Sequence, residues 1–455
     1  MTTHSVPHPG VAPFYRLVWR WHFYAGLVVA PFLVTLALTG LLIAHGEGLD
    51  NWRLPPPAPA AVGASTALSL QLQAAAQAVP GARVDTVQVP ATPEEPVVFM
   101  LAGADGPLRV TINPATGAVH TVQAVSDTVV HLATAIHGTL LLGEVGDVIL
   151  EVVAGLAIIT VASGLWLWTL SGGGRHLSMG ASRLARAGVR KIHAQLGLPL
   201  GLLLLFFLIS GMAWTGVWGG RIVQAWGTFP AEKMAPAPLS GSAHASLNHG
   251  ALKQQPWALE QTPLPLSGSA AGTEGIPQGV AVNLENVVAF ARQAGFQGRF
   301  KVNLPRDHGG VFTISSNSME GDSPSPTGDR TVHLDQHSGR VLADVRFADY
   351  GPGGRAMAVG IALHKGYLGL CNLVLDTLVC LSVVFMAVSG LVMWWRRRPS
   401  GRLGAPMIAA GYRGPVGATV ITGLVCLAFP LTGLAVLLFI VLDRVLPPRW
   451  RRGTA

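Results

Sequence analysis

Five long apolar segments, separated by polar ones, constrain the fold of this chain more than any other feature. They cover residues 21–44, 148–170, 196–217, 373–395 and 416–442. An α-helix needs about 20 apolar residues to cross a hydrocarbon layer of about 30 Å, and each segment is long enough. The first is too long for a signal-peptide core and lacks a clear cleavage site. The sequence therefore predicts a membrane α-helical bundle of five transmembrane helices.

The composition supports a membrane protein and excludes several other classes. Hydrophobic residues make up 50% of the chain and charged residues 12%, more apolar surface than soluble cores of this size could bury. The three cysteines lie in apolar segments, so no disulfide framework is indicated. The net charge of +8 comes from Arg and Lys that flank the apolar segments. This placement indicates orientation in a lipid bilayer rather than nucleic-acid binding.

Basic residues predict which side of the membrane each loop occupies. If each segment crosses once, three basic stretches fall on one side: Arg16 and Arg20; Arg175, Arg183, Arg186, Arg190 and Lys191; and Arg396, Arg397, Arg398, Arg402 and Arg413. The positive-inside rule makes that side cytoplasmic. Residues 46–147 and 218–372 are then periplasmic segments of a bacterial inner-membrane protein. The basic tail at 449–452 falls on the opposite side and is the one exception.

The chain carries an internal repeat. The first and third apolar segments align without a gap, and the second and fourth align at another offset. Two histidines that precede the second and fourth segments correspond after a one-residue slip. The matched residues are His22 with His193, Gly26 with Gly197, Gly40 with Gly211, Ser163 with Ser389, Gly164 with Gly390, and His137 with His364. We therefore predict an internally duplicated bundle.

Each long polar segment predicts a small α+β domain. In the first, a helix over 68–79 precedes strands near 83–89, 96–102, 108–112 and 118–122. In the second, a helix over 284–293 precedes strands near 298–304, 310–316, 330–334 and 340–345. A turn that opens with Asn113 or Asp335 and closes with Gly117 or Gly339 joins the last two strands of each.

These predictions divide the chain into twelve parts. They are the N-terminus 1–17, the first span 18–46, the first α+β domain 64–126, a short helix with the second span 128–170, a basic loop 171–190, the third span 191–219, a linker 220–279, the second α+β domain 280–347, a short helix with the fourth span 356–396, a second basic loop 397–414, the fifth span 415–443 and the tail 444–455. The linker looks disordered, and it contains His244 and His249. His308, His333 and His337 are expected on the surface of the second domain.

His22 and His193 are the first candidates for a cofactor site. A histidine inside a spanning helix is costly and tends to be functional. His22 and Gly40 are 18 residues apart, about five helical turns, so with Gly26 they share one face. The third segment repeats this face with His193, Gly197 and Gly211. An axial nitrogen beside glycines suits a flat macrocycle, so we predict that both histidines ligate one haem b near the cytoplasmic face. The alternative is that they are interfacial anchors on helix-packing faces.

His137 and His364 are the candidates for a second haem b near the periplasmic face. Here too the alternative is a solvated histidine at the membrane interface. His45, at the outer end of the first span, and His131 stay in reserve as ligands, since neither has a symmetry mate. Covalent attachment of haem c is excluded because the sequence has no C-x-x-C-H motif.

Several motifs together resemble the PepSY-associated transmembrane helix family of iron-regulated membrane proteins. They are Trp21-His22 with Gly26, Ile136-His137-Gly138 followed by Gly143 and Gly146, Ser163-Gly164-Leu165-Trp166, Ile192-His193, Leu363-His364 and Ser389-Gly390. The resemblance covers nearly the whole chain. It implies that the two α+β domains are PepSY-like, and the family includes periplasmic ferric-siderophore reductases.

The leading hypothesis is a dihaem electron-transfer protein that reduces a ferric siderophore or other ferric chelate. The sequence has no dinucleotide-binding glycine fingerprint or P-loop, so electrons from the cytoplasm would come from a separate, unidentified donor. One alternative is a membrane protein whose PepSY-like domains bind or regulate a partner without a redox cofactor. Another is a transporter-like subunit, which the absence of a broken helix disfavours.

Overall fold

A computed structural model describes residues 11–53, 65–170, 186–224, 233, 236–249, 253–399, 403–406, 408, 412 and 414–445. The chain divides into two compact units. We call Met1–Leu41, Ile136–Arg221 and Thr377–Ala455 the helical unit, and Leu42–Ala135 with Ile222–Asp376 the sheet unit. The first basic loop lies mostly outside the described residues, as does the tail.

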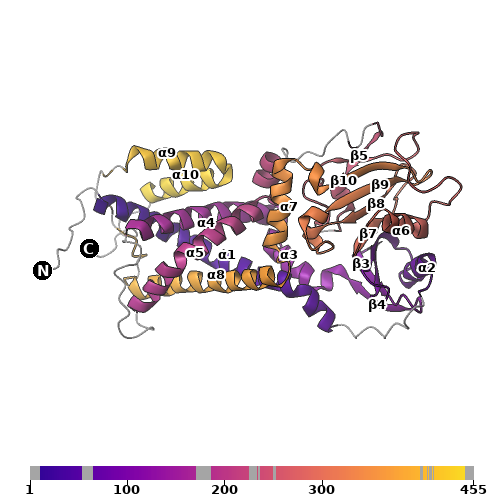
Figure 1. Ribbon diagram of the computed structural model, residues 1–455. Coiled ribbons are helices and arrows are strands. Elements are labelled where there is room, and N and C mark those ends of the chain that lie inside the picture. The colour runs from indigo at the N-terminus through magenta and orange to yellow at the C-terminus, as the bar shows by residue number, and fades with distance from the viewer. Residues whose placement is uncertain are drawn as a thin grey trace. The chain divides into compact units, whose positions relative to one another are not determined.

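Four helices are long and apolar enough to cross a membrane. They are α1 (Val11–Arg53), α4 (Glu144–Leu170), α5 (Arg186–Met212) and α8 (Leu370–Arg397), all shown in Figure 1. The first four predicted spans are therefore confirmed as apolar helices. Two apolar cores hold them together. One joins α1, α4 and α5 around Val29, Val153 and Leu208, and the other joins α1, α5 and α8 around Ala37, Leu200 and Val383.

α1 runs in the opposite direction to α4 and to α8. A Cβ placed at Gly26, early in α1, would lie 3.7 Å from Thr160 in the second half of α4. At the far end of α1, a Cβ at Gly40 would lie 3.6 Å from Cys380, early in α8. The ends with the predicted basic loops therefore gather at one end of the helical unit, which we call the basic end.

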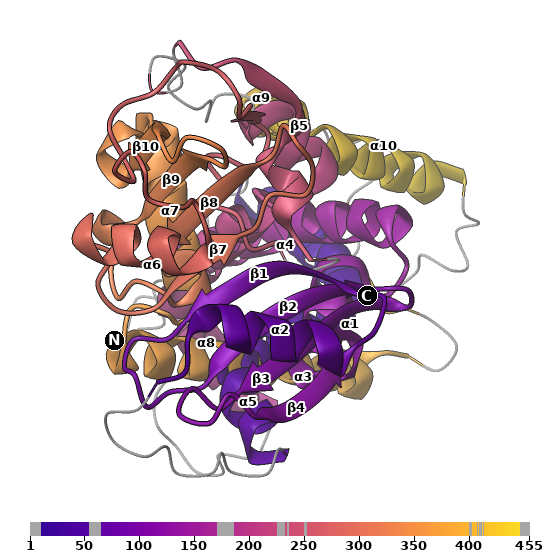
Figure 2. The same cartoon turned by 90° about the vertical axis from the view of Figure 1, so that its right-hand side faces the viewer.

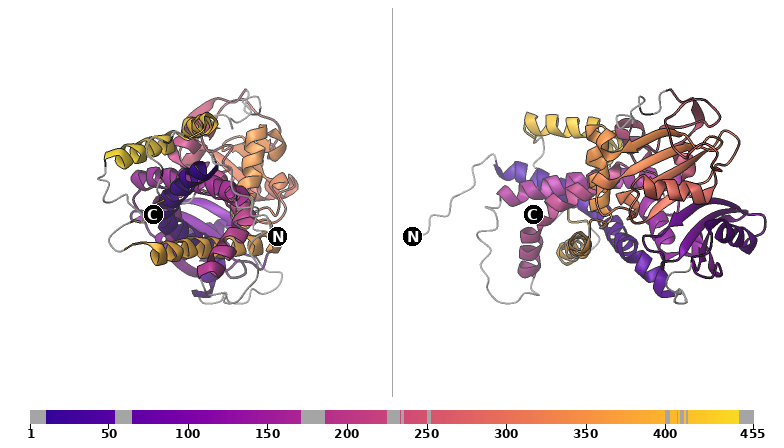
Figure 3. Two further views of the ribbon diagram at one scale, coloured as in Figure 1. Left: turned by 90° about the vertical axis from the view of Figure 1, so that its left-hand side faces the viewer. Right: turned by 45° about the vertical axis from the view of Figure 1, so that its right-hand side comes forward.

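The predicted fifth span is wrong, because the structure has two short helices in its place. α9 (Val416–Ala428) and α10 (Pro430–Val445) are separate in Figures 1 and 3. At 1.5 Å per residue they measure about 20 and 24 Å, shorter than a hydrocarbon layer of about 30 Å. Proline has no N–H and favours the first turn of a helix, so α9 ends at Ala428 and Pro430 starts a new helix.

Contacts within the helical unit show that α9 and α10 form a hairpin. A Cβ at Gly414, just before α9, would lie 3.0 Å from Leu17 at the basic end. At the other end of the unit, the indole N–H of Trp218 donates to the carbonyl of Ala428 at 3.0 Å, and its ring stacks on Phe429. α10 then runs back along α4, where Val436 is buried.

This hairpin predicts that both chain termini lie on the same side of the membrane. Four crossings bring the chain back to the side where it starts, and the hairpin enters and leaves there. Reporters fused to either terminus, green fluorescent protein and alkaline phosphatase, should give the same sidedness. Opposite sidedness would show that α9 and α10 together cross the membrane. On our prediction the basic tail is no exception to the positive-inside rule.

The sheet unit contains the predicted helices and strands. The first polar segment forms α2 (Leu68–Ala78), β1 (Arg83–Val89), β2 (Val97–Gly103), β3 (Gly106–Ile112) and β4 (Val119–Ala124). The second forms α6 (Leu284–Gln293), β7 (Phe300–Asn303), β8 (Val311–Ser316), β9 (Arg330–Asp335) and β10 (Val341–Arg346). Each segment is therefore one helix followed by an antiparallel meander.

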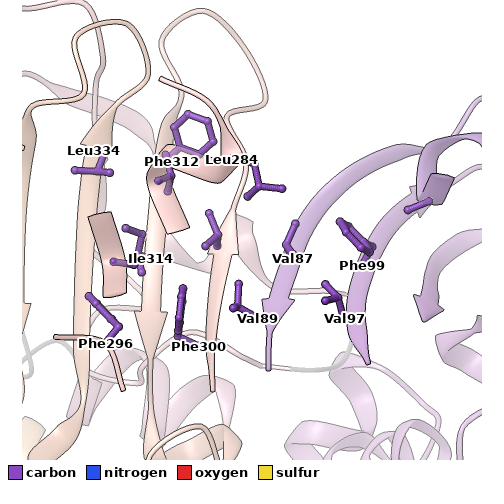
Figure 4. Close-up of a cluster of buried hydrophobic side chains, with 14 of the residues drawn as sticks. Val87, Val89, Val97, Phe99, Leu284, Phe296, Phe300, Phe312, Ile314 and Leu334 are labelled. Carbon is purple, nitrogen blue, oxygen red and sulfur yellow. The ribbon is translucent and has the colours of Figure 1, made fainter. Parts of the chain in front are cut away.

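The two segments do not form two separate domains. Their strands make one eight-stranded sheet in the order β10-β9-β8-β7-β1-β2-β3-β4. The join is an antiparallel pairing of β1 with β7, in which Val87 lies opposite Val302. One hydrophobic core runs across the join beneath α2 and α6, which lie on one face of the sheet in Figure 2. Figure 4 shows this core, with Val87 and Phe99 from the first segment and Phe300 and Ile314 from the second.

The predicted disordered linker is also partly wrong, because much of it is folded. Its described residues include β5 (Leu239–Ala243), η5 (His244–Leu247) and β6 (Pro263–Pro265). His244 and His249 are buried. We call residues 236–279 the strap. Hydrogen bonds from polar side chains hold the strap against the rest of the sheet unit. The Asn317 amide donates to the Gln254 carbonyl at 2.9 Å, and Arg306 donates to the Ser246 carbonyl.

Short helices connect these parts. They are η1 (Val125–Asp127), α3 (Val129–Thr139), the π-helix η2 (Gly216–Val223), η6 (Ser318–Glu320), η7 (Pro326–Gly328), η8 (Phe347–Asp349) and α7 (Pro352–His364). α3 and α7 are the predicted short helices before the second and fourth spans. Glu151 of α4 accepts the N–H groups of Val217 and Trp218 at 3.2 and 3.0 Å, which fixes the start of η2.

Candidate functional site

The structure places His22 on α1 near the basic end, against α4. Its Nδ1 lies 2.8 Å from the Thr160 carbonyl and 3.2 Å from the Ser163 hydroxyl. The imidazole also lies directly over Gly164, where a Cβ would come within 2.9 Å of Cε1. A residue larger than glycine at 164 would displace the ring, so the Ser163-Gly164 pair both holds and accommodates His22.

His193 occupies a matching position on α5, against α8. Its Nδ1 lies 2.9 Å from the Ser389 hydroxyl, and a Cβ at Gly390 would lie 3.6 Å from its Cε1. A Ser-Gly pair on a neighbouring helix therefore supports each histidine. The two imidazoles are near enough for their charges to interact, and their ligation of one haem stays a prediction.

Hydrogen bonds define the tautomer of both histidines. The Thr160 carbonyl can only accept, so the Nδ1 of His22 carries the proton. The Ser389 hydroxyl donates its own proton to the Met386 carbonyl, so it accepts from the Nδ1–H of His193. Each Nε2 is left with a free lone pair and makes no hydrogen bond with the described residues. An Nδ1–H held in place with Nε2 unprotonated is the form in which histidine ligates iron.

The predicted glycines Gly26 and Gly197 lie where neighbouring helices come into van der Waals contact. A Cβ at Gly26 would meet only Thr160 Cγ2, at 3.7 Å, among the described atoms within 4 Å. A Cβ at Gly197 would meet only Met386 Cε, at 3.8 Å. The donor set and its tautomers fit a haem with two axial histidines. Among the described residues no group of three or more His, Cys, Asp or Glu could hold a metal ion.

His137 lies at the opposite end of the helical unit, on α3 beside α1. Its Nδ1 lies 2.9 Å from the Thr39 hydroxyl, and a Cβ at Gly40 would lie 3.6 Å from its Cε1. Thr39 donates its own proton to the Thr35 carbonyl at 2.8 Å and therefore accepts from the Nδ1–H of His137. The arrangement repeats that of His22: a hydroxyl fixes Nδ1 and a glycine lies beside the ring.

The remaining predicted residues are placed as follows. His364 is the last residue of α7 in the sheet unit, so its pairing with His137 stays a prediction. Gly211 lies near the end of α5. Of the reserve ligands, His45 is exposed on α1, and His131 on α3 is half-buried.

The hydroxyl partners were not predicted as functional residues. Ser163, Ser389 and Thr39 fix the rings, yet a serine in a spanning helix usually only bonds its own backbone. The signal that could have identified them is their position: Ser163-Gly164 and Ser389-Gly390 recur at one offset, as His22 and His193 do.

A second pair of histidines lies in the sheet unit, at a place where we expected none. His333 was predicted on the surface and His244 in a disordered linker; both are fully buried, with their Nε2 atoms 3.0 Å apart. The Nδ1 of His244 donates to the Thr262 carbonyl at 2.8 Å, so its Nε2 accepts from His333. The Nδ1 of His333 then accepts from the Thr313 hydroxyl at 3.0 Å. His308 and His337 are exposed, as predicted.

Acid should destabilise the strap through this histidine pair. Burial lowers the pKa of His244 to about 4 and that of His333 well below its usual value. The unfolded chain binds these protons near pH 6.5, so stability is lost as the pH falls from 6.5 to 4, by about 3 kcal/mol for His244 alone. The thermal unfolding midpoint at pH 4.5 should be lower than at pH 7. His244→Gln should reduce this difference and His308→Gln should not; equal midpoints at both pH values would contradict the prediction.

Two comparisons relate this chain to known proteins. A search of the curated proteins found no match. The model of the family described as the PepSY-associated TM region matches residues 19–397, which include most of α1, the other three spanning helices, the whole sheet unit and every histidine discussed above. This chain therefore belongs to the PepSY-associated TM region family.

Proposed function

We propose that the protein is a dihaem b electron-transfer protein that reduces ferric chelates, foremost ferric siderophores, on the periplasmic side of the bacterial inner membrane. The observation that carries this proposal is the pair His22 and His193. Two half-buried imidazoles from two helices, each with Nδ1–H fixed and Nε2 unprotonated, have the chemistry of axial ligands. A haem b bound between them supplies one-electron chemistry between Fe(III) and Fe(II).

The residues around the ligands have separate tasks. The Thr160 carbonyl, with the Ser163 hydroxyl beside it, and the Ser389 hydroxyl orient the two rings and, by accepting Nδ1–H, would raise the electron density on Nε2. Gly26 and Gly197 share the helix faces of the two histidines, and their lack of a side chain would let a flat macrocycle come close to α1 and α5. The apolar core of α1, α4 and α5 excludes water, which lets burial and ligation set the potential.

The second proposed ligand pair, His137 and His364, would extend the electron path across the membrane. The support is His137, whose hydroxyl partner and neighbouring glycine repeat the surroundings of His22 at the other end of the bundle. The predicted basic loops would place His22 and His193 near the cytoplasm, where a separate donor delivers the electron. His137 and His364 would then pass it to the ferric chelate.

The substrate class rests on the resemblance to ferric-siderophore reductases and on coordination chemistry. Siderophore oxygens are hard ligands that prefer Fe(III), so one-electron reduction weakens the complex and releases Fe(II). We infer that the sheet unit shapes the approach of the chelate, and that no covalent chemistry by the protein is required.

Electron transfer across a vesicle membrane tests the proposal. Vesicles carrying the purified protein are loaded with dithionite, and a ferric hydroxamate is added outside with a chromogenic Fe(II) chelator. External Fe(II) should form far faster than with protein-free vesicles, and His22→Ala should remove most of this rate. A rate equal to that of protein-free vesicles would contradict the proposal.

A second candidate function is a partner-binding or regulatory protein without a redox cofactor. It is favoured by the edge strand β4, which exposes Val119 and Val122 at the end of the sheet and could pair with an extended partner segment. In that case the purified protein would contain no haem, and the histidines would only connect helices.

A further inference from the structure

The buried histidine pair of the sheet unit has no role in the proposed electron transfer. His244 starts η5 on the strap, and His333 lies on β9. Both side chains are 0% exposed. Their rings are inclined at 63°, and the two Nε2 atoms are 3.0 Å apart. The pair therefore presents two ring nitrogens to one point in the protein interior, one from each side of the contact between strap and sheet.

An oxygen atom lies behind each of the two rings. The Nδ1 of His244 lies 2.8 Å from the Thr262 carbonyl and 3.0 Å from the Thr262 hydroxyl. That hydroxyl donates its own proton to the Leu259 carbonyl at 2.7 Å, so it accepts from His244. The Nδ1 of His333 lies 3.0 Å from the hydroxyl of Thr313, which is its cross-strand neighbour on β8. Such support of the second ring nitrogen orients histidines that bind metal ions.

A single hydrogen atom lies between the two rings. It sits on the Nε2 of His333, because the Nε2 of His244 is the acceptor. If this proton moves to the Nδ1 of His333, the Thr313 hydroxyl can rotate and accept it. Both Nε2 lone pairs then face the gap between the rings. A metal–imidazole bond is about 2 Å long, so an ion in line between the rings requires them to separate by about 1 Å.

Coordination number and charge decide which ion suits this pair. Zn²⁺ normally takes four ligands, and the described residues contain no group of three or more His, Cys, Asp or Glu that could hold a metal ion. Burying a charge is costly, which favours a monovalent ion over a divalent one. Cu(I) is monovalent, accepts two ligands in line, and imidazole suits copper. Asp335 lies two residues beyond His333 on the same face of β9, so its carboxylate would offset part of the charge.

We propose that His244 and His333 form a two-coordinate Cu(I) site that joins the strap to the sheet. The ion leaves its carrier ligand and forms one bond to each Nε2, while the hydrogen bond between the rings breaks. The proton of His333 moves from Nε2 to Nδ1, so no proton is released and no electron is transferred. Because the ion binds only when the strap is in place, it stabilises the strap. This proposal is independent of the proposed haem sites.

The copper content of the full-length protein tests the site. Wild type and three variants are equilibrated without oxygen, in ascorbate, with Cu(I) buffered by bicinchoninate, and copper per chain is measured by mass spectrometry. Wild type should hold one copper more than His244→Gln and one more than His333→Gln. His308→Gln, which changes an exposed histidine of the same unit, should match wild type. Equal copper in all four proteins would overturn the proposal.

X-ray absorption of the wild-type protein at one copper per chain supplies a readout that does not depend on the folding of a variant. The spectrum should show two nitrogen ligands at about 2 Å. Three or four ligands would overturn the two-coordinate site. Zn²⁺ that binds to wild type as tightly as Cu(I), and is lost in His244→Gln, would overturn the assignment of the ion.

Hydrogen–deuterium exchange tests whether the ion joins the strap to the sheet. The amides of His244 and Ala245 donate to strap carbonyls at 2.9 and 2.8 Å, so they report on opening of the strap. At a free Cu(I) concentration of about 100 times the dissociation constant, their exchange in wild type should slow by about 100-fold. Unchanged exchange in protein that has bound copper would place the ion elsewhere and overturn the proposal.

Discussion

Replacing His22 with alanine should remove about half of the haem from the purified protein, because one of two proposed sites loses an axial ligand. The loss should be in the site with His193, whose own ring stays held by Ser389. His193→Ala should give the same loss, and the double variant should lose no more than either single variant. The measurement is the haem content per chain from the visible spectrum of the reduced pyridine complex.

A matched control comes from His45, which is exposed on the same helix. His45→Ala should keep the full haem content. If His22→Ala and His193→Ala also keep it, the assignment of the inner ligands is wrong. Ser163→Ala should have a milder effect than His22→Ala. Loss of a hydroxyl that orients a ligand typically lowers metal affinity by about 10- to 100-fold, and the ligand itself remains.

Replacing Phe99 with alanine should destabilise the whole sheet unit by about 3–5 kcal/mol, not only the segment that contains it. Phe99 on β2 is 0% exposed and belongs to the core that continues through Phe300 on β7 and Ile314 on β8. Because the two segments share this core and the β1–β7 pairing, they should lose structure together. Hydrogen–deuterium exchange should therefore become faster in β8 and β9 as well as in β2.

The control for this experiment is Val122→Ala on β4, at the edge of the sheet. Val122 is 48% exposed, so its truncation should change stability by no more than about 0.5 kcal/mol. Faster exchange confined to the first segment in Phe99→Ala would show that the two segments fold independently, as the sequence had predicted.

The sequence predicted those parts of the fold that depend on local patterns. Apolar length is a local property, and it predicted α1, α4, α5 and α8. Alternation and turn residues predicted the strands, including the turn at Asp335, whose side chain accepts the N–H groups of His337 and Ser338 at 2.8 Å.

Features that depend on distant contacts were not predicted. The pairing of Val87 with Val302 joins strands more than 200 residues apart, and no local pattern specifies it. The turn at Pro430 was missed because both sides are apolar, so mean hydropathy continues through it. The strap looked disordered from its Pro, Gly and Ser content, yet polar contacts such as that between Asn317 and Gln254 bury it.

The candidate site, like the fold, was predicted only in part from the sequence. Repetition along the chain selected His22, His193, His137 and His364 as candidates, because matching stretches of the two halves carry the same residue types, with a one-residue slip between His137 and His364. The hydrogen bonds that fix Nδ1 of His22 and His193 required the structure, since their acceptors lie on other helices.

The central claim is that paired histidines of the bundle hold haem b. The most direct test is the visible absorption spectrum of the full-length protein, purified from haem-replete cells and recorded before and after dithionite reduction. We predict a Soret band that shifts on reduction, with sharp α and β bands of low-spin haem and two haems per chain. A colourless protein would contradict the claim and leave a membrane scaffold that carries a single eight-stranded sheet.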